Sequence, residues 1–375
     1  MFEIFSRDNS SHARTGRIHL SHGPVDTPVF MPVGTNGTVK AVHHRDLEEL
    51  GTGLILANTY HLYLRPGIEI IRKAGGLHAF TNWKGNYLTD SGGYQVFSLA
   101  PFRKITDDGI KFRSHIDGSY HVLSPEDVVE LQCAFGSDIM MPLDVCTPPG
   151  ITYRKALDAL ITTRAWAERS KRAWAEKGSD TGGLLFGIIQ GNFFEDLRKQ
   201  SAEDILALDL PGIALGGLSV GESTSEFIHY LAYTSRFLPE DKPRYVMGIG
   251  TPEYILEAVE NGIDLFDCVF PTRIARNGSV FTRRGILPLK KIRFASQMEP
   301  IEPDCPCPAC RHYTRAYLRH LFKCGEILGP MLASLHNLYF MDRFLHDIRS
   351  AIREGTFASF KKSFLDGYAP GEKDS

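Results

Sequence analysis

Residues 184–190 have the sequence Leu-Leu-Phe-Gly-Ile-Ile-Gln, an apolar run without breaks that ends on a polar amide. An unbroken run differs from the alternating pattern of a half-exposed strand and is typical of a parallel strand covered on both faces. Seven further runs of this kind occur along the chain, at residues 28–33, 53–58, 87–90, 138–144, 212–217, 245–250 and 264–270. Eight such strands predict an α/β fold, a (β/α)8 TIM barrel.

The stretches between these runs carry helix and hairpin signals. Ser124 is followed by a proline and two acidic residues, which is the pattern of a capped helix start with acids at the positive end of the dipole. Residues 162–177 are amphipathic and predict another helix. Two insertions predict β-hairpins, residues 111–123 with an Asp-Gly turn and residues 277–287.

Length and composition are those of an enzyme-sized globular protein. The chain has 375 residues, 43% of them hydrophobic, so one barrel with its insertions can take up most of the sequence. The net charge of −2 argues against indiscriminate binding to polyanions but leaves room for a local basic face. The first residues lack the basic-then-apolar order of a secretory leader, and we expect a cytoplasmic protein without a membrane partner.

A cysteine cluster stands near the C-terminus. Cys305, Cys307 and Cys310 are spaced to hold a zinc ion together with His336, which lies beyond a helical stretch. Four protein ligands leave no open position for an activated water, so one structural Zn²⁺ is predicted rather than a catalytic one. Other residues compete with His336 for the fourth place, namely His312, His320 and Cys324. The expected zinc-binding subdomain covers residues 277–345, and the barrel covers residues 1–276 and 346–375.

Polar residues end several of the predicted strands. In a TIM barrel the working residues lie at the carboxyl ends of the strands, and these ends carry Asp90, Asp144, Gln190, Gly216, Gly217, Met247 and Asp267. Carboxylates and an amide beside glycine backbone suit a planar ligand that forms hydrogen bonds. Since no Walker lysine is present, the glycine pairs favour close backbone approach to a ligand over phosphate binding.

Asp267 interrupts the apolar run 265–270. An ionised carboxylate there costs several kcal/mol unless it is paired, so it either has a structural partner, such as Arg273 or Arg276, or it takes part in chemistry. Asp90 has a structural alternative too, because its side chain can cap the turn that follows. Two carboxylates at one barrel mouth permit a nucleophile and an acid/base partner, as in covalent glycosyl transfer.

A basic stretch predicts a phosphate-binding face. From Arg273 to Arg293 no acidic residue intervenes, and further cations continue to Lys323. A solvated edge of the zinc subdomain is the alternative. Tyr313, Tyr317, His320 and Cys324 recur at helical spacing, which predicts core packing first and an aromatic dimer contact second.

Five motifs in order resemble those of the tRNA-guanine transglycosylases, also called queuine tRNA-ribosyltransferases. They are Leu88-Thr-Asp-Ser-Gly-Gly-Tyr-Gln-Val-Phe-Ser98, Gly187-Ile-Ile-Gln-Gly191, Ala214-Leu-Gly-Gly-Leu-Ser-Val-Gly-Glu222, Phe266-Asp-Cys-Val-Phe-Pro-Thr-Arg273 and Cys305-Pro-Cys-Pro-Ala-Cys310. The resemblance covers nearly the whole chain. It implies exchange of the wobble guanine in tRNAs for Asp, Asn, His and Tyr, without ATP or a redox cofactor. The incoming base is a 7-deazaguanine.

The resemblance also implies roles for individual residues. Asp267 attacks the ribose and forms a covalent intermediate, Asp90 moves protons, and Asp144 accepts from the donors of the base. Gln190 and the Gly217 amide donate to the base carbonyl. Further implied base-binding residues are Ser91, Gly92, Gly93, Tyr94, Cys146, Leu218, Val220 and Met247. Tyr94 and Met247 are expected to sandwich the ring. Implied tRNA contacts are Gly248, Ile249, Gly250, Thr251, Pro252, Glu253, Thr272, Arg273, Ile274, Ala275 and Arg276.

Cys146 and Val220 resemble the bacterial subtype, which prefers the small precursor 7-aminomethyl-7-deazaguanine over queuine. Family membership further implies a homodimer that holds one tRNA. Two alternatives remain open at this point. An archaeal-type relative modifies the tRNA core instead, and a non-catalytic zinc and tRNA-binding subunit would be expected to lose Asp90 and Asp267, both of which are present here.

Overall fold

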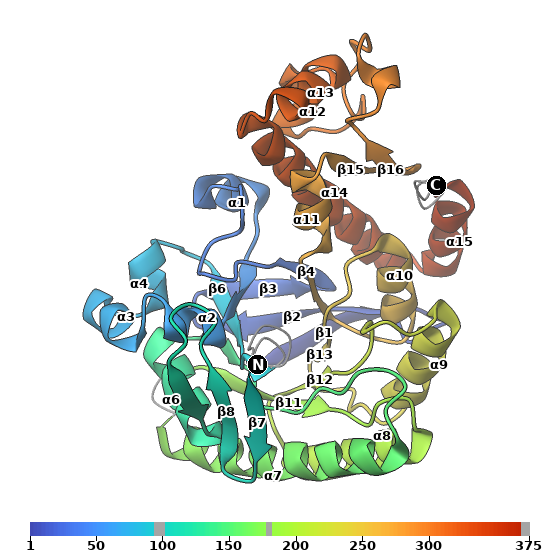
Figure 1. Ribbon diagram of the computed structural model, residues 1–375. Helices are drawn as coiled ribbons and strands as arrows, with labels where there is room; N and C mark the ends of the chain where they lie inside the picture. The colour runs from blue at the N-terminus through green and yellow to red at the C-terminus, as the bar shows by residue number, and fades with distance from the viewer. Residues whose placement is uncertain (94–101, 178–181, 369–375) are drawn as a thin grey trace.

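The structure is a computed structural model of the chain that describes residues 1–93, 102–177 and 182–368. Figure 1 shows a ring of helices around a central sheet, with the C-terminal helices and one hairpin standing above it. No helix in the described ranges is both long enough and apolar enough to pass through a bilayer.

Eight parallel strands form the barrel, and the predicted fold is confirmed. They are β4 (Val29–Pro32), β5 (Leu54–Asn58), β6 (Asn86–Asp90), β10 (Ile139–Met140), β11 (Leu184–Ile189), β12 (Gly212–Leu215), β13 (Arg244–Val246) and β14 (Leu265–Cys268). The sheet order is β4-β14-β13-β12-β11-β10-β6-β5. A parallel bridge between Val33 and Leu56 joins the two ends and closes the ring. Each of the eight predicted apolar runs overlaps one of the eight barrel strands.

Helices follow the strands around the outside. They are α1 (His44–Leu50), α2 (Thr59–Leu64), α3 (Ile68–Ala74), α4 (Leu77–Thr81), α6 (Pro125–Phe135), α7 (Tyr153–Lys177), α8 (Glu195–Leu206), α9 (Thr224–Ser235), α10 (Pro252–Glu260) and α11 (Phe270–Arg276). The Ser124 cap is confirmed, because its side chain accepts from the Asp127 amide while the Asp127 carboxylate accepts from the Ser124 amide. Helix α7 begins earlier than the predicted residue 162.

A small antiparallel sheet that the sequence analysis missed closes the amino-terminal end of the barrel. It consists of β1 (Phe2–Arg7), β2 (Arg14–Leu20) and β3 (Gly23–Thr27). Ile18 and Val25 pack into the buried cluster that fills the barrel. The guanidinium of Arg14 forms two hydrogen bonds with the carboxylate of Asp264, at 2.6 and 3.0 Å, and both side chains are buried. This ion pair ties the small sheet to the start of β14.

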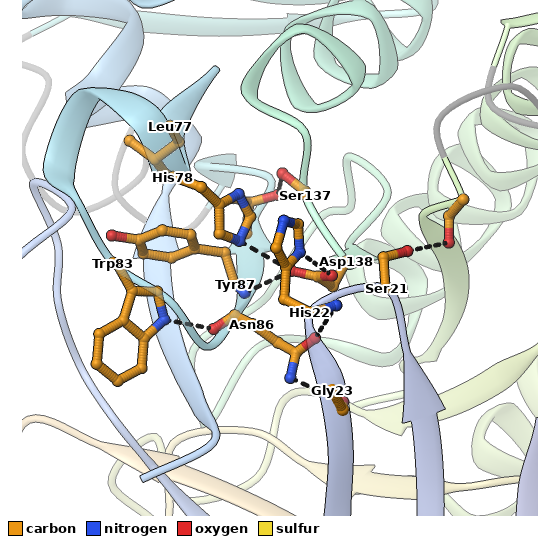
Figure 2. Close-up of polar contacts among 12 residues, drawn as sticks. Ser21, His22, Gly23, Leu77, His78, Trp83, Asn86, Tyr87, Ser137 and Asp138 are labelled. Atoms are coloured by element: carbon orange, nitrogen blue, oxygen red, sulfur yellow. Dashed lines mark hydrogen bonds and ion pairs between the residues drawn. The ribbon is translucent and has the colours of Figure 1, made fainter. Parts of the chain in front are cut away.

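Figure 2 shows how the β2–β3 turn is attached to the barrel. Asp138, just before β10, accepts a hydrogen bond from the Tyr87 amide (2.8 Å) and lies 2.7 Å from Nδ1 of His22. The rings of His22 and His78 stack with centroids 3.6 Å apart and planes 14° apart. Nitrogen lone pairs lie in the ring planes, so two nearly parallel rings do not aim at one shared ion. We therefore interpret this group as a clamp and not as a metal site.

The C-terminal elements form a second, smaller core. They are β15 (Ser279–Thr282), β16 (Gly285–Pro288), the 3-10 turn η1 (Ile292–Phe294), α12 (Pro308–His312), α13 (Arg315–Cys324), α14 (Leu328–Arg353) and α15 (Phe357–Gly367). The predicted hairpin is confirmed as β15 and β16. Helix α14 runs without a break from this core, at Leu332, to the main core, at Ile348. Its Arg349 donates to the Pro28 carbonyl next to β4 (2.8 Å).

A three-stranded antiparallel sheet is inserted between β6 and α6. Its strands are β7 (Arg103–Thr106), β8 (Gly109–Arg113) and β9 (Tyr120–Leu123). The predicted hairpin of residues 111–123 is confirmed as β8 and β9, whereas β7 was not predicted. We refer to these three strands as the insertion sheet.

Candidate active site

The carboxyl ends of the barrel strands bring the predicted polar residues to one rim. Asp90 ends β6 and Asp267 lies in β14, while Asp144, Gln190 and Met247 follow β10, β11 and β13. Several of these carboxylates lie close enough to act on the same side chains electrostatically. The charges of both Asp267 and Asp90 help to raise the pKa of Tyr245, and the charges of Asp144 and Asp90 help to raise that of Cys146. The mouth thus concentrates carboxylates.

Asp267 is held by two donors on its Oδ1 atom. The Tyr245 hydroxyl donates at 2.6 Å and the Gly248 amide at 2.8 Å. Burial raises the pKa of Asp267, and these two hydrogen bonds oppose that rise. The arginine partners considered from sequence are wrong, because the partners of Asp267 among the described residues are Tyr245 and Gly248, and neither Arg273 nor Arg276 pairs with it. Tyr245 comes from the neighbouring strand β13, which the sequence analysis did not consider.

Burial, followed by the charge of Asp267, raises the pKa of Tyr245 well above its ordinary value. The phenol therefore keeps its proton at neutral pH and remains a donor to the carboxylate. Hydrogen bonds to an ionised group are among the strong ones in proteins. Tyr245 and Gly248 thus position Asp267 as a carboxylate with a fixed orientation.

Asp90 takes part in the turn that follows it, as the structural alternative predicted. Its Oδ1 accepts from the Ser91 amide at 2.9 Å, and its Oδ2 lies 3.3 Å from the Asn58 amide group. Gly92 has φ +92°, and a Cβ there would lie 2.6 Å from the Tyr60 side chain. Only glycine fits this turn. Asn58 was missed, although its position as the last residue of a predicted strand was an available signal.

Asp144 and Gln190 follow the neighbouring strands β10 and β11 and contact each other at the mouth. The Gln190 amide group donates to Asp144 Oδ2 at 2.7 Å, and the Gln190 Oε1 atom is buried without a partner among the described residues. Asp144 is 8% exposed. Burial raises the pKa of Asp144 to about 6, and the hydrogen bond from Gln190 opposes that rise. A buried acceptor next to a buried amide is suited to a ligand that presents both donors and an acceptor.

Arg198 of α8 is a further residue of the site that the sequence analysis missed. It is fully buried, and its guanidinium donates to the carbonyls of Asn192 (2.8 Å), Gly216 (2.8 Å) and Gly217 (3.1 Å). Burial lowers the pKa of Arg198 to about 10, so the group stays charged at neutral pH. Gly217 has φ +67°, and a Cβ there would lie 2.6 Å from Gln190 Oε1. Arg198 therefore fixes the backbone that presents the Gly217 amide.

The loop after β12 carries two of the residues predicted to bind the base. Leu218 is buried and Val220 is partly buried. The Glu222 carboxylate accepts from the backbone amides of Val220 (2.8 Å) and Gly221 (3.1 Å), which holds the loop in a tight turn. Glu222 is the last residue of the motif at residues 214–222, but no role was predicted for it.

Cys146 lies beside Asp144, and its pKa is raised to about 12, first by burial and then by the charge of Asp144. The thiol is therefore protonated and is not a nucleophile at neutral pH. Met247 is partly buried against the cluster that fills the barrel. Tyr94, its predicted partner in the sandwich, lies outside the described residues.

The predicted tRNA contacts fall on two adjacent segments. Residues 248–253 form the turn after β13 and the first turn of α10, and residues 272–276 lie in α11 directly after β14. Arg273 is exposed. Arg276 is partly buried, and burial followed by the charge of Arg273 lowers its pKa. Two cations thus stand one helix turn apart, next to the strand that carries Asp267.

The cysteine cluster closes around His336. The Nδ1 atom of His336 lies 3.8, 3.3 and 3.4 Å from the sulfurs of Cys305, Cys307 and Cys310, and all four side chains are buried. Tetrahedral zinc with the usual bond lengths places a nitrogen and a sulfur ligand about 3.6 Å apart, so the group fits that ion. The Nε2 atom of His336 lies 2.8 Å from the Phe281 carbonyl, a typical second contact that orients a metal-binding histidine.

The competing fourth ligands lie elsewhere. His312 is exposed, and the His320 ring contacts the sulfur of Cys324 at 3.7 Å. The expected core packing of the α13 stripe is wrong. Tyr317 is 40% exposed, and it stacks with Tyr313 (centroids 5.5 Å) and His320 (6.3 Å) along the surface.

Three cations of the predicted phosphate-binding face have partners within the protein. Arg283 pairs with Asp347, Arg315 donates to the Gln297 side chain at 3.0 Å, and Arg319 donates to the Lys291 carbonyl at 3.1 Å. These contacts fit the alternative of a structural edge for that part of the stretch.

The chain is similar to one family of known proteins along nearly its whole length. The model of the family described as "TGT: Queuine tRNA-ribosyltransferase" matches residues 8–370. The queuine tRNA-ribosyltransferase of Borrelia duttonii is 54% identical over 371 residues, which is 99% of each chain. That of Borrelia hermsii is 55% identical over 372 residues, again 99% of each. That of Treponema denticola is 54% identical over 368 residues, 98% of this chain and 97% of the other.

Proposed function

This chain belongs to the queuine tRNA-ribosyltransferase family, and from that premise we propose how its barrel mouth performs the exchange of guanine at the tRNA wobble position. The observation that carries the assignment is the pairing of a donor-held carboxylate, Asp267, with a buried recognition pair, Asp144 and Gln190, at one mouth. The first provides a nucleophile and the second a base pocket. An archaeal-type enzyme that acts on the tRNA core does not fit relatives that carry the queuine name.

Asp267 is the proposed nucleophile. Both of its hydrogen bonds go to Oδ1, so we assign the attack on the ribose C1′ to Oδ2. The new Oδ2–C1′ bond replaces the C1′–N9 bond, and the electron pair of the broken bond leaves on the guanine. The incoming base then attacks C1′ and displaces Asp267, so two displacements at one carbon retain its configuration.

Asp90 is the proposed proton carrier. It ends β6, while Asp267 lies in β14, and the pKa of Tyr245 responds to the charges of both. The departing guanine needs a proton, and the incoming base must lose one before it attacks. A single carboxyl group that gives the first proton and takes the second satisfies both steps.

Asp144, Gln190 and Gly217 are the proposed recognition groups. The two oxygens of Asp144 accept from the N1–H and the 2-amino group of guanine, while Gln190 and the Gly217 amide donate to its O6. The base replaces the present contact between Gln190 and Asp144. Arg198 keeps the Gly217 peptide in place for this contact.

The remaining pocket residues set the size of the incoming base. We propose 7-aminomethyl-7-deazaguanine, because Val220 and Cys146 resemble the bacterial subtype. Ser91, Gly92, Gly93 and Leu218 shape the walls, and Tyr94 and Met247 are proposed to hold the ring between them.

We also propose one structural zinc ion per chain at Cys305, Cys307, Cys310 and His336. The buried thiol and imidazole groups fit it, and no step of the reaction passes through it. The proposed zinc subdomain remains residues 277–345, on a barrel of residues 1–276 and 346–375. Its separate small core supports this division, and α14 belongs to both units.

The tRNA is proposed to lie on residues 248–253 and 272–276, where the exposed Arg273 and the half-buried Arg276 reach its phosphates. We propose a homodimer as well, supported by the exposed aromatic ladder on α13. A cytoplasmic location is proposed because none of the seven cysteines forms a disulfide, as expected in a reducing compartment.

Incubation with tRNA and radiolabelled guanine tests the proposed nucleophile and pocket together. Wild-type protein is expected to incorporate label into tRNA, and mixing with a base analogue is expected to trap a covalent species on a denaturing gel. Asp267→Asn is expected to bind tRNA but to form no adduct, since an amide is a poor nucleophile. Peptide mapping of the adduct to Asp90 would reverse the two roles.

A further inference from the structure

The insertion sheet buries one face and leaves the other open. Ile110, Phe112 and Leu123 are no more than 3% exposed and lie in the main core. On the opposite face, Tyr120 is 63% and Val122 54% exposed. Residues on one face of a strand alternate with those on the other, so the open face is a regular surface of the sheet and not a frayed edge.

Cations occupy the open face next to the aromatic side chains. Lys111 pairs directly with Lys104 on one side and with Val122 on the other, while Arg113 pairs with Tyr120. The Lys111 Nζ atom lies 5.7 Å from the centroid of the Tyr120 ring, and the Arg113 guanidinium lies 6.0 Å from it. The Phe102 ring meets Tyr120 edge to face, with centroids 6.1 Å apart.

This charge arrangement is unfavourable without an anion. Lys104 and Lys111 are like charges on directly opposite residues, a pairing that destabilises a sheet. Neither lysine has an ion pair among the described residues. The sequences of β7, β8 and β9 contain no aspartate or glutamate, and the nearby acids Asp107, Asp108 and Asp117 lie in the turns. A bound polyanion would relieve the repulsion.

The insertion sheet stands at the rim of the mouth. It leaves the barrel after β6, the strand that ends with Asp90. Helix α2 anchors it, because the Tyr60 hydroxyl lies 2.7 Å from His115 and the Tyr63 hydroxyl lies 2.9 Å from His121. The residue before α2 is Asn58, whose side chain contacts Asp90. Figure 1 shows β7 and β8 beside α2 and α6.

We propose that the open face of the insertion sheet is a second RNA-binding surface for the tRNA whose wobble nucleotide occupies the mouth. The inference rests on the proposed function. Lys104, Lys111 and Arg113 would contact the phosphates, and Tyr120 would stack on an unpaired base, the combination by which open surfaces hold single-stranded RNA. An apolar protein partner would not call for three cations, so RNA is the occupant that the charges favour.

The first test compares charge variants of the full-length protein. Lys104→Glu with Lys111→Glu is expected to raise KM for tRNA at least about five-fold and to reduce the salt slope of tRNA binding by about 1 to 2. KM for free guanine and kcat are expected to stay unchanged. The matched control, Lys84→Glu with Arg172→Glu, changes two exposed cations at the other end of the barrel and is expected to leave all of these values unchanged.

The second test isolates stacking. Tyr120→Ala is expected to weaken tRNA binding at least about five-fold, and Tyr120→Phe is expected to retain wild-type affinity because the ring remains. Crosslinking of photoreactive tRNA to wild-type protein is expected to label a peptide within residues 102–123.

The outcomes separate the two levels of inference. Wild-type protein that incorporates no guanine at all contradicts the proposed function. Normal incorporation with an unchanged KM for tRNA in the double variant, or crosslinks that avoid residues 102–123, overturns the second surface alone. If KM rises equally for tRNA and for guanine, the insertion sheet has a structural role. That result also overturns the second RNA-binding surface.

Discussion

Asp144 is buried, yet its proposed role in base binding requires the ionised carboxylate. Burial raises its pKa from 3.8 to about 6, so ionising it in the folded protein costs up to about 3 kcal/mol more than in the unfolded chain. The pKa is higher in the folded state, so this cost is absent below the ordinary pKa and is complete above pH 6. The ionised form is nevertheless the one that, in the proposed function, accepts two hydrogen bonds from guanine.

Asp144→Asn is therefore expected to be more stable than wild type at neutral pH but to bind guanine less tightly. At pH 8 the variant should unfold at a higher denaturant concentration than wild type, and the difference should shrink as the pH falls from 6 towards 4. Guanine binding should weaken by about 1 to 3 kcal/mol, because one acceptor becomes a donor. Chemical denaturation across pH and KM for guanine measure the two effects. Equal stability of the variant and wild type at pH 8 would contradict an Asp144 that is both buried and ionised.

Tyr245→Phe tests the hydrogen-bond support of Asp267, the proposed nucleophile. It removes one of the two donors to Asp267, so burial would raise the pKa of Asp267 further and the acid limb of the rate profile should move to higher pH. We expect kcat to fall about ten-fold or more. The pH dependence of kcat/KM is the measurement. Tyr87→Phe, which loses a hydroxyl bonded to the Gly37 carbonyl, is the control that should not move the limb.

At the residue scale, the sequence predicted the polar residues of the mouth better than it predicted their partners. Asp90, Asp144, Gln190 and Asp267 were predicted because polar residues ended apolar runs. The partner of Asp267 was sought among residues close in sequence, whereas Tyr245 reaches it from the next strand. Only the order of strands in the sheet reveals such a contact.

At the scale of elements, periodicity predicted which residues share a face but not what covers that face. On α13, Tyr317 and His320 share a face as expected, yet the face packed into the small core is that of Leu318 and Leu321. The N-terminal sheet was missed for a related reason. Strand β1 alternates between partly buried and exposed residues and contains no long apolar run.

Helix α14 links the cluster of three cysteines and His336 to the barrel, so loss of the proposed zinc ion should affect both. His336→Ala is expected to abolish zinc binding and to destabilise the protein by more than about 3 kcal/mol. His312→Ala, an exposed histidine of the same subdomain, is the matched control and should retain zinc and stability. Metal analysis and thermal unfolding measure these effects. Zinc retained by His336→Ala, or lost by His312→Ala, would show that the ligand set is wrong.

At the scale of the whole molecule, the barrel was predictable because eight buried parallel strands leave the same signature eight times. Its amino-terminal closure was not predictable, since the buried pair of Arg14 and Asp264 joins residues far apart in sequence. Arg14→Ala is expected to cost about 3 to 5 kcal/mol, because it leaves the Asp264 carboxylate buried without its cation.

The activity of the Arg14→Ala protein is a separate readout. The ion pair lies at the end of the barrel opposite the mouth, so kcat at a temperature where the variant is folded should match wild type. Denaturant unfolding and guanine exchange measure the two effects. A large loss of kcat in the folded variant would mean that this end of the barrel communicates with the mouth.

The pairing of β4 with β14 has a consequence for synthesis on the ribosome. Val29 and Leu265 are register partners, so the first barrel strand leaves the ribosome long before its neighbour exists. At ordinary translation rates the wait is roughly 10 to 50 seconds. During that time one edge of β4 and the apolar interior stay open to other chains, which is the condition that chaperones relieve. A nascent chain that stops before β14 cannot close its barrel and should be a substrate for quality-control proteases.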